Sequence, residues 1–341
     1  MNLLCQIFRA TSVSALLLST LNPQLSTFAQ GSLAPPGAPA PTMKSLAQIE
    51  PRTPISSLPY TITNPGSYYV TTNLTGVSGA NGITIASGDV TLDLNGFALV
   101  GVPGSLHGVF VFTNVFYLNL TVRNGTVRGW DGNGVEAFNG ENVILEDLTV
   151  SDTGGFGIDA YGGVIRDCQV DSSGDTGIVG DVSEIRHCVV ENAGFDGIDA
   201  YDSQVRDCVV EFNQYGIYAA PGKVSDCLIE TNSFSGILAG SSGCQITGNT
   251  CVGNNFNAST SDAGIYLNAS NNRVEDNHVA GSGYAGIQVA SGASTRNLII
   301  KNSVSGNGAN NFITPGQQIV GPLITATGTI TNANPWANFS F

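Results

Sequence analysis

The sequence predicts an all-β fold, a parallel β-helix of about ten rungs with capped ends, and three observations predict it. A glycine followed by Ile or Val recurs close to every 20 residues in the middle of the chain and at longer intervals toward both ends. Apolar and variable residues alternate after these glycines, which is the period of a β-strand. Charged residues make up only 11% of the chain, which excludes a helical protein covered in charge pairs. Repeats of this length without a helical period form a coil in which each turn pairs only with its neighbours.

The first 44 residues are expected to precede the folded body. Arg9, the apolar run 13–18 and the small-residue sequence Thr27-Phe28-Ala29 predict a signal peptide over residues 1–29. Residues 30–44 are rich in Pro and Ala and predict an extended linker, because proline lacks an amide donor. No later stretch approaches about 18 uninterrupted apolar residues, so no membrane span is expected. We therefore expect a protein that is secreted or otherwise extracytoplasmic.

The repeats are expected over residues 82–311. Each rung would hold three short strands: one after the glycine, one ending at a Cys or Asn bend, and one closing on Val or Ile. Residues 45–81 and 312–341 leave the repeat frame, and we expect them to form an N-terminal and a C-terminal cap, because an open end exposes unpaired strand edges. The repeat glycines are Gly82, Gly108, Gly134, Gly157, Gly177, Gly197, Gly216, Gly236, Gly264 and Gly286.

Some segments carry a more specific pattern. Val274-Glu-Asp-Asn277-His-Val279 is followed by Gly286-Ile287-Gln-Val289, and the same frame covers roughly residues 80–310. This pattern resembles that of the secreted right-handed parallel β-helix repeat proteins with the pectin-lyase-like fold. Residues 54–69 and 335–341 look like the terminal regions of an uncharacterised bacterial subgroup. The resemblance implies a right-handed coil, and because this fold hosts lyases, hydrolases, epimerases, adhesins and inert rods, it implies no single activity.

One inward column changes from cysteine to asparagine along the chain. In the family this bend holds an asparagine ladder, whose amides hydrogen-bond from rung to rung. We expect the cysteines of the column to be buried free thiols, because parallel side chains hold their Cβ atoms about 4.8 Å apart, farther than a disulfide allows. Cys244 and Cys251 are left as a possible local pair. The column comprises Cys168, Cys188, Cys208, Cys227, Asn249, Asn277 and Asn302.

The outward side of the strands that follow the glycines gathers carboxylates and aromatic rings. The resemblance places substrates along this face, and sugars bind by stacking on rings and by hydrogen bonding to carboxylates. Asp159, Asp181 and Asp199 are the candidate catalytic residues, because glycoside hydrolysis needs a carboxylic acid and a carboxylate on opposite sides of one bond. The candidate substrate-binding residues are Phe110, Glu136, Phe138, Tyr161, Tyr201, Tyr218 and Tyr266.

The expected partner is an extracellular polysaccharide or cell-surface glycan, contacted by a monomer. A formal charge of −14 and only 12 Lys and Arg exclude nucleic acid, which needs a basic surface. Two alternatives stay open: a structural or adhesive rod without a catalytic site, and a glycoside hydrolase or polysaccharide lyase. The ordered motifs of polygalacturonases are absent. No cofactor and no metal site are expected, although the three aspartates could offer oxygen ligands to Ca²⁺.

Overall fold

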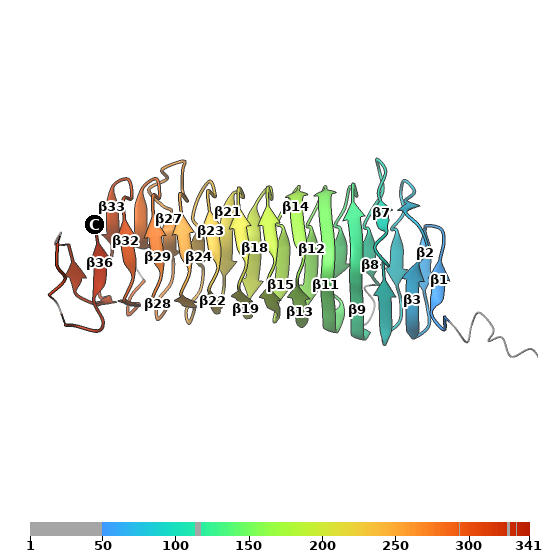
Figure 1. The fold of residues 1–341 in the computed structure, drawn as a ribbon, viewed down its shortest axis with the longest axis horizontal. Coiled ribbons are helices and arrows are strands. Elements are labelled where there is room, and N and C mark those ends of the chain that lie inside the picture. The colour runs from blue at the N-terminus through green and yellow to red at the C-terminus, as the bar shows by residue number, and fades with distance from the viewer. Residues whose placement is uncertain (1–49, 113–116, 293, 326–327, 332) are drawn as a thin grey trace, which may run out of the picture. The chain divides into compact units, whose positions relative to one another are not determined.

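In the computed structural model, the described residues are 50–112, 117–292, 294–325, 328–331 and 333–341. They form a β-solenoid of twelve turns, in which every strand pairing is parallel and the described residues contain no helix (Figure 1). The expected signal peptide over 1–29, the linker over 30–44 and the start of the N-terminal cap lie outside these residues. The predicted fold class is confirmed.

Each turn contributes one strand to a first ladder, which holds the residues after the repeat glycine. Its order is the order of the sequence, so each strand pairs with the strand of the turn before and the turn after. The strands are β2 (Tyr60–Ile62), β5 (Ile83–Ile85), β8 (Val109–Val111), β10 (Val135–Ala137), β12 (Ile158–Tyr161), β15 (Ile178–Asp181), β18 (Asp196–Tyr201), β21 (Tyr215–Ala219), β24 (Ile237–Ala239), β27 (Ala263–Leu267), β30 (Ala285–Val289) and β33 (Asn310–Ile313).

A second and a third ladder close the coil, and two long strands, β9 (Tyr117–Arg128) and β11 (Gly140–Thr153), run through both. The second ladder also contains β1 (Thr53–Ile55), β3 (Gly66–Val70), β6 (Val90–Asp93), β13 (Gly163–Arg166), β16 (Glu184–Arg186), β19 (Ser203–Arg206), β22 (Gly222–Ser225), β25 (Gln245–Thr247), β28 (Arg273–Glu275), β31 (Leu298–Ile300) and β34 (Ile319–Val320). The third contains β4 (Leu74–Thr75), β7 (Ala98–Val100), β14 (Gln169–Ser173), β17 (Val189–Glu191), β20 (Val209–Glu211), β23 (Leu228–Glu230), β26 (Thr250–Val252), β29 (His278–Ala280), β32 (Ser303–Ser305) and β36 (Asn338–Ser340), the last paired also with β35 (Leu323–Ile324).

The ladders extend beyond the glycine repeat at both ends. Strands β1 to β4 lie within the range expected as the N-terminal cap, and β33 to β36 fall at or beyond the start of the C-terminal cap. Ile55 and Ile62 are fully buried although no repeat glycine precedes them. Backbone pairing and inward apolar residues are therefore enough to continue the coil where the Gly-Ile pattern is absent.

The repeat glycines are required because there is no room for a side chain between the start of the first-ladder strand and the third ladder. An added Cβ at Gly177 would overlap the Cγ1 atom of Val190 in the third ladder and would lie 2.7 Å from the carbonyl oxygen of Gly197. An added Cβ at Gly157 would overlap Val170 in the same way, and one at Gly197 would overlap Val210. The glycine thus lets the first strand of a turn approach the third strand at the core.

Replacing Gly177 by Ala is expected to lower the free energy of unfolding by about 1 to 3 kcal/mol, because a side chain and a backbone carbonyl must both move. Urea unfolding monitored by circular dichroism measures the loss. Adding Val190→Ala to this variant removes one of the two overlaps, so the double variant should lose less than the sum of the single changes. Strict additivity would show that the two residues are not in contact.

The bend between the second and third ladders combines a left-handed residue with a stacked amide. Asp167 has φ of 55° and Asp207 has φ of 54°, a conformation that Asp and Asn tolerate better than most residues. After this residue the asparagine ladder forms as expected: the backbone N–H of Asn249 donates to Oδ1 of Asn277 at 2.9 Å, and that of Asn277 donates to Asn302 at 3.0 Å. Each amide thereby satisfies buried backbone groups of a neighbouring turn.

The cysteines are buried and unbridged, in agreement with the prediction for the column. The local pair considered for Cys244 and Cys251 does not form, because the two residues occupy different places in the coil. The backbone N–H of Cys244 donates to Oδ1 of Asn272 at 2.8 Å, within a second amide ladder between the first and second strands, whereas Cys251 points inward from β26. Burial raises the pKa of both thiols, so neither is an activated nucleophile.

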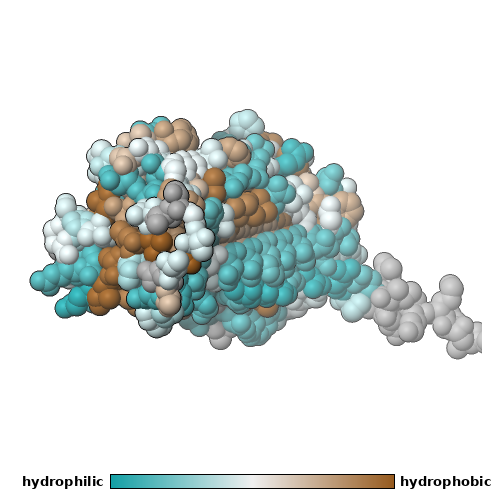
Figure 2. Space-filling view, turned by 60° about the vertical axis from the view of Figure 1, so that its left-hand side comes forward, coloured by the Kyte–Doolittle hydropathy of each residue, from teal (hydrophilic) through white to brown (hydrophobic). Residues whose placement is uncertain are grey.

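The C-terminal end of the solenoid exposes apolar side chains. Figure 2 shows hydrophobic residues gathered at this end, beside the hydrophilic surface of the ladders. Ile319 is 59% exposed and Trp336 is 51% exposed, and both line a pocket of about 440 Å³. The last turn therefore covers the core only in part.

Candidate functional site

The outward side chains of the first ladder form one continuous column across the middle turns. Strand pairing places Glu136 beside Asp159, Asp159 beside Val179, and Val179 beside Asp199. A second column, two residues farther along each strand, sets Tyr161 beside Asp181 and Asp181 beside Tyr201. The three aspartates singled out from the sequence therefore lie on one surface, which we call the first-ladder face; it comprises the outward residues of β8 to β27.

Asp159 is far less solvated than an outward position suggests. It is only 8% exposed, and its Oδ1 atom is buried without a hydrogen-bond partner among the described residues. Desolvation, together with the nearby charges of Glu136, Asp181 and Asp199, raises its pKa to about 7. Asp159 is thus partly protonated at neutral pH.

The neighbouring carboxyl groups are shifted in the same direction. Burial and the charge of Asp181 raise the pKa of Asp199 to about 6, and burial and the charge of Asp202 raise the pKa of Asp181. Burial also raises the pKa of Glu136, partly opposed by a hydrogen bond that Nδ2 of Asn133 donates to its Oε2 atom. No described Lys, Arg or His lowers the pKa of these four carboxyl groups.

Aromatic residues border these carboxyl groups. The rings of Phe138 and Tyr161 meet edge to face with their centroids 5.9 Å apart, and Phe110 stacks on His107 at 5.3 Å. Phe138 and Tyr201 are exposed, so their rings are open to a ligand. Tyr266 is separated from Tyr218 by Leu238 in the column and does not join the other candidates.

A pocket of about 280 Å³ opens on this face between β18 and β21. Its lining residues are Phe195, Asp196, Asp199, Tyr215, Tyr218 and Leu238. The ring of Tyr215 lies between those of Phe195, 5.7 Å away edge to face, and Phe234, stacked 5.0 Å away. Gly240 leaves room for the ring of Tyr218, because a Cβ there would overlap it. The pocket therefore joins fixed rings with two carboxyl groups.

Asp196 and Tyr215 were missed by sequence reasoning, although a signal was present. Both precede a repeat glycine, and strand pairing sets them beside one another. Each first-ladder strand was expected to begin after its glycine, which left this position in the turn. Asp196 is 5% exposed, and burial with the charges of Asp199 and Asp175 raises its pKa to about 7.

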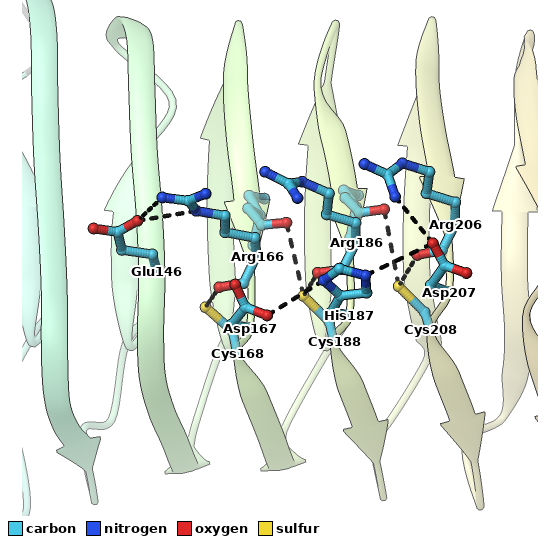
Figure 3. A network of polar contacts seen from close by, with 12 residues as sticks. Glu146, Arg166, Asp167, Cys168, Arg186, His187, Cys188, Arg206, Asp207 and Cys208 are labelled. Carbon is cyan, nitrogen blue, oxygen red and sulfur yellow. Dashed lines mark hydrogen bonds and ion pairs between the residues drawn. The ribbon is translucent and has the colours of Figure 1, made fainter.

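The described cations concentrate on another side of the solenoid. Figure 3 shows Arg166 paired with Glu146, and Arg206 with Asp207, along the second ladder, where His187 lies between Asp167 and Asp207. The Nη2 atom of Arg206 is also 2.7 Å from Oε1 of Glu184. Among the described residues, no Lys or Arg stands on a strand of the first ladder. The carboxyl groups of the first-ladder face are therefore left without counter-charges.

Within the part of the chain that the structure describes, no group of three or more His, Cys, Asp or Glu side chains is arranged to hold a metal ion. His107 uses its Nδ1 atom to accept the backbone N–H of Asn133 at 3.0 Å, and burial lowers its pKa. The same described residues contain no helix with the length and apolar character needed to cross a membrane.

The coil, its amide ladders and its parallel register define a right-handed β-solenoid. The chain belongs to the family described as right-handed beta helix region, which matches residues 62–205 and 200–320. The resemblance to the pectin-lyase-like fold is thereby confirmed. A search of curated proteins finds no match.

Solved structures share the fold at low sequence identity. The A-module of the mannuronan C-5 epimerase AlgE4 of Azotobacter vinelandii aligns with a TM-score of 0.65 and 15% identity, over 76% of this chain and 84% of that one. The A-module of AlgE6 from the same organism aligns with a TM-score of 0.54 and 15% identity, over 84% and 88%. The tailspike protein of E. coli bacteriophage HK620, in complex with a pentasaccharide, aligns with a TM-score of 0.54 and 14% identity, over 77% and 60%.

Proposed function

We propose that this protein is exported and binds a polysaccharide along the first-ladder face. The observation that carries the proposal is the pocket between β18 and β21, where rings and carboxyl groups adjoin on a strip that continues across several turns. Rings offer apolar faces to sugar rings, and carboxyl groups accept hydrogen bonds from hydroxyls. An extended sugar chain matches such a strip in shape. Two of the structural relatives, a mannuronan C-5 epimerase module and a tailspike protein in complex with a pentasaccharide, are consistent with this proposal.

Removing a ring from the face is expected to weaken glycan binding by about 3- to 10-fold per ring, because aromatic contacts contribute on the order of 1 kcal/mol each. A glycan array screened with residues 50–341 identifies the ligand, and calorimetry on Tyr218→Ala and Tyr201→Ala measures the loss. Tyr69→Ala is the matched control, since this ring lies over Arg52 on the second ladder. Loss of affinity in the control alone would place the binding surface elsewhere. Absence of binding to every glycan would favour a structural rod.

Hydrolysis of the bound glycan is a second candidate function, favoured by the pKa values of two carboxyl groups on the same face. Asp159, with a pKa of about 7, suits a general acid, and Asp199, with a pKa of about 6, suits a general base two turns away, with Val179 in the turn between them. If this reaction occurs, Asp159→Asn and Asp199→Asn should each slow it by roughly 10²- to 10⁴-fold with little change in affinity. Release of reducing ends from the glycan identified above measures the rate. Equal rates in both variants and the parent protein would exclude this pair.

A further inference from the structure

The pocket between β18 and β21 favours one kind of ligand, because its aromatic rings and its carboxyl groups both attract cations. Phe195, Tyr215 and Tyr218 offer aromatic rings, and Asp196 and Asp199 offer carboxyl groups. The faces of aromatic rings carry negative partial charge and attract cations, most strongly where water is excluded. Carboxylates attract the same ligands. Rings and carboxylates around one small cavity are the chemical setting in which ammonium groups bind.

The burial of Asp196 also favours a positively charged ligand. The residue is only 5% exposed, and it lines the pocket. No described hydrogen bond or ion pair involves its side chain, whose carboxyl oxygens keep some contact with solvent at the pocket. A buried carboxyl group without a partner is costly unless a ligand supplies the missing charge or donor. Because burial and the charges of Asp199 and Asp175 favour the protonated form of Asp196, a positively charged ligand would shift this group toward its carboxylate.

We propose that this pocket binds a protonated or quaternary ammonium group, so that the polysaccharide recognised by the first-ladder face is one that carries positive charge. The recognition of a positively charged polysaccharide rests on the proposed function, whereas the binding of an ammonium group does not. The ammonium group would sit against the rings of Tyr215 and Tyr218, with the carboxylate of Asp196 as its counter-ion. Asp199, which belongs to the same strand, adds a second negative charge at the pocket wall.

The electrostatics of the wider face agree with this choice. Glu136, Asp159 and Asp181 continue the negative field toward the N-terminal turns, whereas the described arginines of the middle turns are paired on the second ladder. A polymer of sugar acids would bring further negative charge to carboxyl groups that already repel one another. A chain of amino sugars would instead relieve this repulsion along its length.

The ammonium site itself is tested with choline by calorimetry at pH 8, above the pKa of about 7 of Asp196, with 3,3-dimethylbutan-1-ol as the neutral analogue of equal shape. We expect choline to bind at least about 10-fold more tightly than the alcohol, and to weaken as salt is raised. Asp196→Asn should remove this preference. Asp226→Asn is the matched control, an exposed carboxyl group at a bend outside the pocket.

The polymer is tested with two hexasaccharides of glucosamine, one with free amino groups and one fully N-acetylated, at pH 7, where Asp196 with its pKa of about 7 is about half ionised. We expect the amino form to bind at least about 10-fold more tightly, and Asp196→Asn to make the two equal. Binding of choline without binding of either hexasaccharide would support the ammonium pocket and contradict the proposed function for this glycan. Equal binding of both hexasaccharides, with no binding of choline, would overturn the ammonium pocket and leave polysaccharide binding standing.

Discussion

Raising the pH from 5 to 8 is expected to lower the free energy of unfolding by roughly 4 kcal/mol, because carboxyl groups of the first-ladder face must ionise while buried. Asp159 and Asp196 each have a pKa of about 7 in the folded protein, against a model value of 3.8. The folded state therefore holds more protons than the unfolded chain between about pH 4 and pH 7, and stability falls as the pH rises through this window.

Asp159→Asn should flatten this dependence and stabilise the protein at pH 8, since an amide of the same shape carries no charge. Urea unfolding at constant ionic strength, at pH 5 and pH 8, measures both effects. Asp226→Asn, which removes an exposed carboxyl group, should keep the parent slope. A parent protein equally stable at the two pH values would show that the carboxyl groups of the face are solvated.

Stability should also fall below pH 4.5 for a separate reason. Lys301 and Arg273 hydrogen-bond to Glu275 and lower its pKa, so its favourable pairing is lost as it protonates. The pH of greatest stability is accordingly expected near 5, in the interval between the two effects.

Replacing Ile198 by Asp is expected to cost at least about 4 kcal/mol and to unfold the middle turns, because an unpaired charge would enter the core. Ile198 is completely buried and stacks in register between Ile178 and Ile217. Since each turn packs mainly on its neighbours, the solenoid cannot bypass a disrupted turn. Circular dichroism during heating and urea titration should show an earlier transition.

Ile198→Val is the control for this change, since it removes one methylene group and should cost only about 0.5 to 1.5 kcal/mol. A normal melting curve for Ile198→Asp, beside a normal curve for Ile198→Val, would mean that this position does not face the core.

Much of the fold can be predicted from the sequence, because every turn of a solenoid repeats the same pattern of strands and bends. The two-residue alternation after Gly177 and Gly197 identifies strands that bury one side, and the glycine itself reports a close approach of backbone to the third strand. The column from Cys227 to Asn302 predicts stacking, since identical places in successive turns coincide. The terminal strands β1 and β36 escaped this reasoning, because they pair through backbone groups without the repeat residues.

The sequence by itself determined the solenoid, its inward columns and the presence of Asp159, Asp181 and Asp199 on one face, because the register of a parallel coil converts a repeat length into spatial neighbours. Only the tertiary structure decided that Asp159 is nearly covered and that Asp196 and Tyr215 join a pocket. Burial depends on how side chains of adjacent turns lean over one another, and the bend before each glycine sets where the preceding residue points. An alternation with a period of two predicts neither the burial of a side chain nor the direction of the residue before the glycine, because it indicates only which side of the strand a residue faces.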